Sequence, residues 1–167
     1  MIYLDSAATT FQKPLSVSYA MQRAMRTMSS PGRGGYAAAR AAEETAFRCR
    51  SLAAELFGVP SPEQVVFASN ATHALNIAIR SLVPEGGRVA VSGYEHNAVT
   101  RPLHALGAEV IVAAAPLFSP QETVEAFERA LAHEPDAVIC THVSNVFGAI
   151  LPIERIAQLC RGASVPL

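Results

Sequence analysis

The pattern of apolar and polar positions divides the chain into a helical first part and an alternating second part. The first predicted helix starts at Pro14, which suits a first helical position. Its expected buried face consists of four apolar residues at helical spacing: Val17, Met21, Ala24 and Met28. A breaker rich in Pro and Gly, residues 29–35, separates it from a longer helix predicted over about 37–57, with Gly58 as its stop.

From residue 65 onward, short apolar runs alternate with amphipathic segments. The predicted strands are 65–68, 88–91, 110–112 and 137–141, and a fifth begins at 165–167. The expected helices between them are one carrying Leu75, Ala78, Ile79 and Leu82, a short or kinked one at about 97–106, one after Ser119 that buries Val124, Phe127, Ala130 and Leu131, and one at about 152–160. The third of these helices has the clearest start, because Ser119, Pro120 and Glu122 together match a capping box. Alternating strands and helices predict an α/β fold, with an open, mainly parallel sheet between helices on both faces.

Composition indicates more apolar surface than the chain can bury alone. The 167 residues are expected to form one domain, in which 50% of residues are hydrophobic and only 16% are charged, against roughly 25% charged in ordinary soluble domains. A sheet whose last strand has only begun would also leave an edge unpaired. We therefore expect an incomplete unit, part of whose surface is covered by something else.

Charge and special residues argue against several classes of function. The net charge of −1, with arginines scattered singly, disfavours nucleic acid as a partner, because phosphate binding needs clustered positive charge. The longest uncharged stretch, 137–153, falls short of a membrane span, and no basic segment of an export signal is evident. Three widely spaced cysteines favour a reducing cytoplasm, and no pair of histidines has the spacing of a metal site.

Polar residues concentrate in the connections that follow the predicted strands. Three such loops, 69–73, 92–97 and 141–145, are dense in hydroxyl, amide and imidazole groups, whereas the helix-to-strand turns have plain turn chemistry. Because ligands gather at the carboxyl ends of parallel strands, we expect the three loops to meet at one edge of the sheet. This edge is the predicted binding site.

Each loop offers a candidate contact that also has a plainer explanation. The amides of Ala71 and Thr72 at a helix start, with the Thr72 hydroxyl, can bind an anion, or the same loop can simply cap its helix. His96 can lie flat on a bound heterocycle or move a proton, or it can only bond to backbone. Asn145 can hold a hydroxyl or substrate group, or it can only shape a turn.

The other histidines and the cysteines favour structural roles. Helix surfaces or turns are expected for three histidines: His73, His104 and His133. Cys49 and Cys160 lie on predicted helices with apolar neighbours, and Cys140 lies inside a predicted strand. We predict that all three cysteines are buried structural thiols.

Several motifs occur in order along the whole chain. They are Tyr3-Leu4-Asp5-Ser6-Ala7-Ala8-Thr9-Thr10 with Lys13-Pro14, Pro31-Gly32-Arg33-Gly34-Gly35, Ser69-Asn70-Ala71-Thr72, Glu95-His96-Asn97-Ala98-Val99 and His142-Val143-Ser144-Asn145-Val146-Phe147-Gly148. Together they resemble the class V aminotransferase family, and within it most closely the cysteine desulfurases and selenocysteine lyases. The resemblance implies a pyridoxal 5'-phosphate enzyme of fold type I, whose active sites lie at a homodimer interface.

The resemblance also implies roles for single residues. Ala71 and Thr72 match the loop that binds the cofactor phosphate, and His96 matches the catalytic histidine that stacks on the pyridine ring. Asn145 matches an asparagine that contacts the hydroxyl side of the cofactor and the substrate.

The amino-terminal segment would lie on the substrate side. Residues 1–13 would form a loop segment near the substrate entrance, where Ala7 and Ala8 are candidates for lining the substrate site. Residues 14–167 would then be the amino-terminal portion of the large, cofactor-binding domain.

The implied reaction removes sulfur from L-cysteine and gives L-alanine and an enzyme persulfide. In such enzymes a lysine holds the cofactor, an aspartate keeps its ring nitrogen protonated and a cysteine thiolate takes the sulfur. The family's aspartate lies on the strand that would continue from 165–167, with its lysine and cysteine further on. The single lysine here, Lys13, precedes every predicted strand and is a poor substitute.

The expected object is therefore an amino-terminal fragment of a cytoplasmic enzyme, inactive alone and homodimeric when complete. Its expected partners are L-cysteine or a similar amino acid and a sulfur-acceptor protein. Two alternatives stay open: another class V aminotransferase or lyase, and a non-catalytic fragment that needs a complementary chain.

Overall fold

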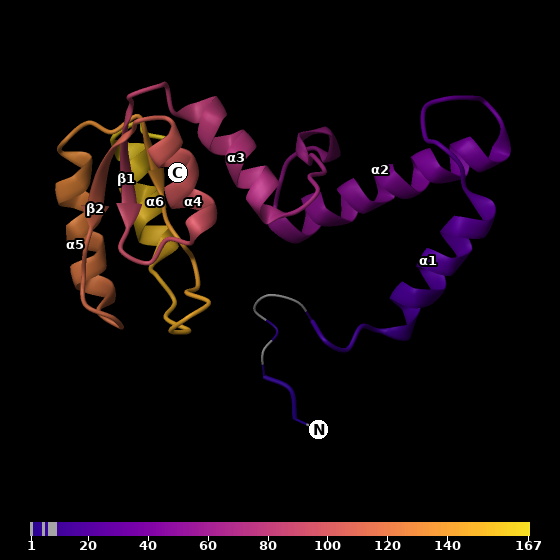
Figure 1. Ribbon diagram of the computed structural model, residues 1–167, viewed down its shortest axis with the longest axis horizontal. Coiled ribbons are helices and arrows are strands. Elements are labelled where there is room, and N and C mark those ends of the chain that lie inside the picture. Colours follow the sequence, from indigo (N-terminus) through magenta and orange to yellow (C-terminus); the bar gives the residue numbers. More distant parts are fainter. Residues whose placement is uncertain (1, 5, 7–9) are drawn as a thin grey trace. The chain divides into compact units, whose positions relative to one another are not determined.

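The computed structural model describes residues 2–4, 6 and 10–167, which divide into two compact units, Met1–Phe67 and Ala68–Leu167. The first unit contains the helices α1 (Leu15–Thr27) and α2 (Ala37–Phe57) and a short 3-10 helix at Pro62–Gln64 (Figure 1). The second unit contains α3 (Ala71–Leu82), β1 (Arg88–Ser92), α4 (Asn97–Ala105), β2 (Glu109–Ala113), α5 (Pro120–Leu131), β3 (Ala137–Ile139) and α6 (Ile153–Gly162).

The first unit forms the two predicted helices but buries little. α2 ends at Gly58, whose φ of 64° lets its N–H donate to carbonyl groups of the last helical turn, as predicted. Pro14 precedes α1 instead of opening it, and the predicted buried face of α1 is wrong: none of its residues is buried, and Met21 is 62% exposed. A helix face is buried only where another layer packs on it, and the described residues of this unit form no sheet.

The second unit is built on a parallel sheet with the strand order β2-β1-β3. Ala90 in the central strand pairs with Ile111 of β2 and Val138 of β3. The chain leaves β1 for β2 through α4, then returns past β1 to β3 through α5. Because such crossovers share one hand, these two helices lie on opposite faces of the sheet. The reversal makes the carboxyl ends of β1 and β3 a topological switch point, where open α/β sheets bind ligands.

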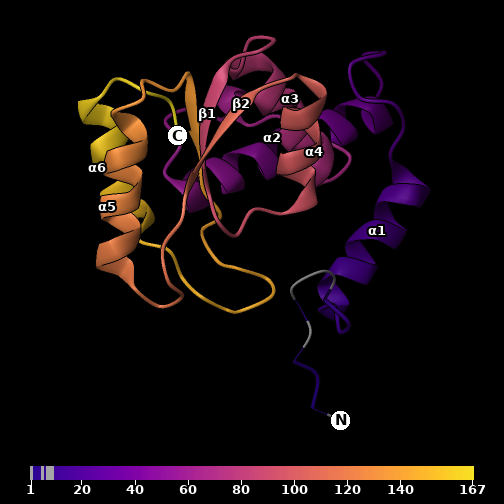
Figure 2. The same ribbon diagram turned by 60° about the vertical axis from the view of Figure 1, so that its left-hand side comes forward.

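Two apolar cores, one on each face, confirm the predicted α/β fold. On one face, α5 and α6 pack against the sheet, burying Phe127, Ile156 and Cys160. On the other face, α3 and α4 bury Ile79, Val99 and Leu103 against the strands. Figure 2 shows the two helix pairs on either side of β1 and β2.

The predicted strand at 65–68 is wrong. This segment has no regular secondary structure, and Val66 and Phe67 are 77% and 53% exposed. An apolar run becomes a strand only where a sheet edge accepts its backbone hydrogen bonds, and no described strand lies beside this one. The predicted fifth strand at 165–167 forms only in part. The Val138 N–H donates to the Pro166 carbonyl at 2.8 Å, but the described sheet has no further strand there.

Two predictions of local detail are also wrong. The Ser119 side chain makes no capping bond at the start of α5; instead the Ser119 carbonyl accepts hydrogen bonds from the Thr123 N–H and the Thr123 hydroxyl. Phe118, with a φ of 60°, sets a different entry into the helix from the one that a capping box requires. Cys49, on α2, is exposed, so its predicted burial is wrong, whereas Cys160 is buried and Cys140 is half-buried.

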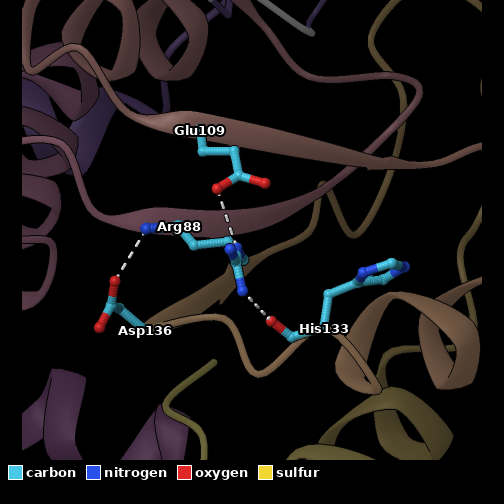
Figure 3. Close-up of polar contacts among 4 residues, drawn as sticks. All are labelled: Arg88, Glu109, His133 and Asp136. Atoms are coloured by element: carbon cyan, nitrogen blue, oxygen red, sulfur yellow. Dashed lines mark hydrogen bonds and ion pairs between the residues drawn. The ribbon is translucent and has the colours of Figure 1, made fainter.

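The amino-terminal ends of the strands are joined by polar contacts around Arg88 (Figure 3). The Arg88 N–H donates to Asp136 Oδ2 at 2.8 Å, and the Asp136 N–H donates to the Arg88 carbonyl at 2.8 Å. The Arg88 guanidinium donates to Glu109 Oε2 at 3.0 Å and to the His133 carbonyl at 2.7 Å. These contacts hold all three strands at the edge opposite the switch point.

Candidate functional site

A cavity of about 370 Å³ lies between α3 and α4, and its end at Thr72 and His96 is at the carboxyl edge of the sheet. Thr72, in the first turn of α3, and His96, immediately before α4, both line it. The structure therefore brings two of the predicted cofactor contacts to one cavity from positions 24 residues apart in the chain. The cavity continues down the facing sides of the two helices.

The start of α3 leaves two backbone N–H groups for a ligand. Asn70 caps the helix, because its Oδ1 accepts a hydrogen bond from the His73 N–H at 2.9 Å. Ala71 and Thr72 occupy the first two helical positions, whose N–H groups have no acceptor within a helix. Asn70 therefore caps the helix. The Ala71 and Thr72 amides, with the Thr72 hydroxyl, remain a candidate anion site.

His96 both caps a helix and lines the cavity. Its Nδ1 accepts a hydrogen bond from the Ala98 N–H at 3.0 Å, so in the neutral ring the hydrogen lies on Nε2. This bond fixes one edge of an otherwise exposed ring. The two interpretations of His96, a backbone contact and a ring that faces a ligand, are therefore compatible in one conformation.

The cavity is rich in positive charge and in hydrogen-bond donors. Arg80 of α3 and Arg101 of α4 line it, together with Asn76, and none of its lining residues is acidic. Among the described residues, neither arginine forms an ion pair with a carboxylate. The hydroxyl and N–H groups at the start of α3 suit an anionic group such as a phosphate. Arg80 lies eight residues further along α3, about 12 Å along the helix axis, so it adds positive charge toward the other end of the cavity.

Asn145 lies outside the lining of this cavity. It is exposed, in a tight loop closed by the Ser144 hydroxyl, which accepts a hydrogen bond from the Phe147 N–H at 3.3 Å, and by Gly148, whose φ is 65°. The Gly148 N–H also donates to the Ser144 carbonyl at 2.8 Å. Asn145 thus lies in a turn, as expected if its role is only to shape that turn.

The loop that carries Asn145 is nevertheless bonded to the loop that carries His96. The Glu95 carboxylate accepts a hydrogen bond from the Thr141 N–H at 2.7 Å and another from the Thr141 hydroxyl at 3.0 Å. The rings of Tyr94 and Phe147 also meet edge to face, 6.2 Å apart. The loops after β1 and β3 therefore do meet at one edge of the sheet.

The remaining candidates divide into those outside the described residues and those without the required chemistry. Ala7 and Ala8 lie outside the described residues. Burial, and then the nearby Glu95 carboxylate, raises the pKa of the Cys140 thiol to about 12, and burial raises the pKa of Cys160. Both thiols are therefore protonated at neutral pH and poor nucleophiles.

Three residues of this region were not predicted from the sequence: Glu95, Arg80 and Arg101. Helical spacing was a usable signal for the arginines, because Thr72, Asn76 and Arg80 recur every four residues, as do Asn97, Arg101 and Ala105. Each set forms one face of its helix. For Glu95 the signal was a carboxylate directly before His96, at the end of a buried strand.

Comparison with known proteins gives one family match that covers nearly the whole chain. The sequence model of the class-V aminotransferases matches residues 2–166. The chain is 32% identical to cysteine desulfurase IscS of Serratia proteamaculans, over 98% of this chain and 42% of that protein. It is 34% identical to the enzyme of the same name from Shewanella sediminis, again over 98% and 42%. The chain thus spans about 42% of the length of these curated relatives.

Solved structures agree on the fold. The apo structure of a cysteine desulfurase from Thermococcus onnurineus matches with a TM-score of 0.87 at 22% identity, over 98% of this chain and 42% of that chain. A structure described as SspA in complex with cysteine matches with a TM-score of 0.81 at 25% identity, over 98% and 48%. In the part of this chain that the structure describes, no helix is both long and apolar enough to cross a membrane.

Proposed function

Because the chain belongs to the class V aminotransferase family, we propose that it is the amino-terminal part of a cysteine desulfurase, which removes sulfur from L-cysteine and leaves L-alanine and an enzyme persulfide. Members of this family depend on pyridoxal 5'-phosphate. The activity belongs to a longer polypeptide, since the chain spans about 42% of the matched desulfurases.

One observation carries the proposal: Thr72 and His96 line the same cationic cavity beside a topological switch point. A phosphate group needs helix-start N–H groups, a hydroxyl donor and positive charge, and a flat heterocycle needs an aromatic neighbour. The cavity lining has the hydroxyl and N–H of Thr72 and the ring of His96 at one end, and the positive charge of Arg101 and Arg80 further along the two helices. The residues present therefore fit the cofactor that the family uses.

Each residue of the site has a separate task in the proposal. Ala71 and Thr72 bind the phosphate through their N–H groups and the Thr72 hydroxyl, and His96 lies against the cofactor ring and holds a proton at Nε2. Asn145 contacts the hydroxyl side of the cofactor and the substrate, and Ala7 and Ala8 line the substrate entrance. When bound, pyridoxal 5'-phosphate withdraws electrons from the α-carbon of an amino acid, which weakens its neighbouring bonds.

The described residues lack the covalent part of this chemistry. The only lysine, Lys13, is exposed in the amino-terminal segment and donates to the Thr10 carbonyl at 2.6 Å. Cys140 and Cys160 are protonated thiols, whereas a sulfur acceptor must be a thiolate, and the exposed Cys49 of α2 does not line the cavity. The chain thus supplies the noncovalent half of the site and is inactive alone in the proposal, with the lysine and the nucleophilic cysteine on other residues of the complete enzyme.

The same proposal includes a cytoplasmic homodimer that passes sulfur to an acceptor protein. Exposed apolar side chains on α1 and α2 support a covered surface there, since Tyr19 and Met25 of α1 and Phe57 of α2 are each more than half exposed. Analytical ultracentrifugation of the complete enzyme tests this part, and a monomer at micromolar concentration would contradict it.

Titration of the chain with pyridoxamine 5'-phosphate tests the site itself. This probe carries the phosphate and the ring but cannot form a Schiff base with Lys13. Thr72→Val should weaken binding at least tenfold, while Thr45→Val, which removes an exposed hydroxyl bonded within α2, should leave binding unchanged. Absence of binding to the unaltered chain, or equal affinities of the two variants, would reject the proposed site.

Product analysis of the complete enzyme distinguishes the family activities. A desulfurase releases one L-alanine for each sulfur atom removed from L-cysteine. Amino-group transfer to a keto acid, or pyruvate as the product, would assign the chain to another class V aminotransferase or to a lyase.

A further inference from the structure

The carboxylate of Glu95 joins the ends of two neighbouring strands. Its Oε1 accepts hydrogen bonds from the Ser92 hydroxyl at the end of β1 and from the Thr141 N–H just beyond β3, and its Oε2 accepts one from the Thr141 hydroxyl. All three bonds are to a half-buried side chain. The link joins two residues 46 positions apart in the sequence.

The position of Glu95 in the chain gives the link a consequence. Glu95 directly precedes His96. The Nδ1 of His96 accepts the hydrogen bond that caps the start of α4, and His96 lines the cationic cavity. Thr141 opens the loop that leads to Asn145. The Glu95 carboxylate therefore connects the Thr141 segment directly to the residue that precedes His96.

Glu95 itself does not line the cavity. Its neighbour Tyr94 is held separately, because the Tyr94 N–H donates to the Ser92 hydroxyl at 3.2 Å and the Tyr94 hydroxyl donates to the Ala115 carbonyl. The Tyr94 ring also contacts Phe147 in the loop after β3. The backbone on the amino-terminal side of Glu95 is thus fixed, and the carboxylate is the contact that fixes Thr141 against it.

We propose that Glu95 is a positioning residue, which clamps the carboxyl ends of β1 and β3 together and so fixes His96 in the cavity relative to the Asn145 loop. The proposal deepens the function proposed above and rests on it for the identity of the bound group. The clamp itself is a property of this chain without any cofactor.

The chemistry of the three bonds predicts which substitutions break the clamp. Glu95→Ala removes all three acceptor contacts. Glu95→Gln retains them in altered form, since the amide oxygen can accept from Ser92 and from the Thr141 N–H, while the amide NH2 can donate to the Thr141 hydroxyl. Thr141→Val removes only the hydroxyl contact, so it is a milder variant if Glu95→Ala unfolds the chain. Glu109→Ala, which removes an exposed carboxylate at the other edge of the sheet, is the matched control.

Amide hydrogen exchange and NMR spectra of the chain without cofactor test the clamp first. In Glu95→Ala the Thr141 amide should exchange at least tenfold faster and the His96 ring signals should shift, while Glu95→Gln and Glu109→Ala should keep both near their original values. Thr141→Val should give an intermediate shift of the His96 ring signals. Unchanged Thr141 exchange and unchanged His96 signals in both Glu95→Ala and Thr141→Val would overturn the clamp.

Binding of pyridoxamine 5'-phosphate then tests its consequence for the site. Glu95→Ala should weaken binding about tenfold and change the circular dichroism band of the bound probe, and Glu95→Gln should restore both to within threefold of the original chain. A loosened clamp with unchanged probe affinity and an unchanged band would overturn the positioning role. If the unaltered chain binds no probe, the proposed function fails, and the exchange and ring signals alone decide the clamp.

Discussion

The two edges of the parallel sheet differ in what their polar groups bind. At the amino-terminal edge, Arg88 satisfies Asp136, Glu109 and the His133 carbonyl, so the polar groups there are paired with one another (Figure 3). At the carboxyl edge, Thr72 at the start of α3 and His96 just before α4 line a cavity of about 370 Å³, which continues along the two helices past Arg101 and Arg80.

This difference separates residues that hold the sheet from residues that bind a ligand. The polar groups at the first edge already have their hydrogen-bond partners within the protein and do not change partner when a ligand binds. Their loss should therefore appear as lost stability. The hydrogen-bond donors that line the cavity gain a partner only when a ligand enters, and their loss should appear as lost affinity. Each prediction below alters one edge, and the Asp136 variants test the separation directly.

The largest effect is expected from ionisation of Cys140, just beyond β3 at the carboxyl edge. Its pKa is raised from 9.0 to about 12, so the folded chain keeps the thiol proton in a range where the unfolded chain loses it. This thiol's contribution to stability is complete below pH 9 and falls as the pH rises toward 12, by up to about 1.4 kcal/mol for each pH unit.

Urea unfolding between pH 7 and pH 11 measures this contribution. The Cys140→Ala variant should lose less stability above pH 9 than the unaltered chain, and the two curves should run parallel below it. Parallel curves over the whole range would show that the Cys140 thiol is not protected from ionisation in the fold.

The next effect is a loss of about 1 kcal/mol in unfolding free energy for Asp136→Ala. The substitution removes the acceptor of the Arg88 N–H at the exposed amino-terminal edge, and Asp136→Asn, which keeps an acceptor oxygen, should recover most of the loss. Urea unfolding measures the stability, and titration with pyridoxamine 5'-phosphate should give the same affinity for both variants. An affinity loss of tenfold in Asp136→Ala would contradict the separation of the two edges.

The order of strands and helices was predictable because it depends on local apolar patterns. The buried side of α5 is one example: Val124, Phe127 and Ala130 follow the helical period and are buried as predicted. The continuous apolar run at 65–68 predicts a strand and does not form one, because a strand also needs a neighbouring sheet edge, which local sequence does not describe.

The site was predictable in part, for a related reason. Thr72 and His96 each follow from a helix start, a local feature, and their sharing of a cavity follows from sheet topology. The Glu95 contact with Thr141 depends on the register of β1 beside β3, where Val91 pairs with Ile139. No pattern within either segment specifies that register, so this long-range contact could not be read from the sequence.

A smaller effect is expected from Phe147→Leu at the carboxyl edge. The edge-to-face contact with Tyr94 should contribute about 0.5–1 kcal/mol beyond its buried area, at a half-exposed position. The variant should lose about that much stability in urea unfolding, and Phe147→Tyr should lose less because it keeps an aromatic ring. Equal losses in the two variants would show that the ring contact adds nothing specific.

The smallest effect is expected from Glu109→Gln, which removes the negative partner of Arg88. The two side chains are 42% and 61% exposed, so water and salt screen their attraction, and Arg88 keeps its hydrogen bond to the His133 carbonyl. The loss of stability should be about 0.5 kcal/mol at low ionic strength and should disappear in 1 M sodium chloride. Urea unfolding at the two salt concentrations measures it. A loss above about 2 kcal/mol that persists in high salt would mean that this ion pair, and not the backbone contacts of Asp136, is the main polar link at the amino-terminal edge.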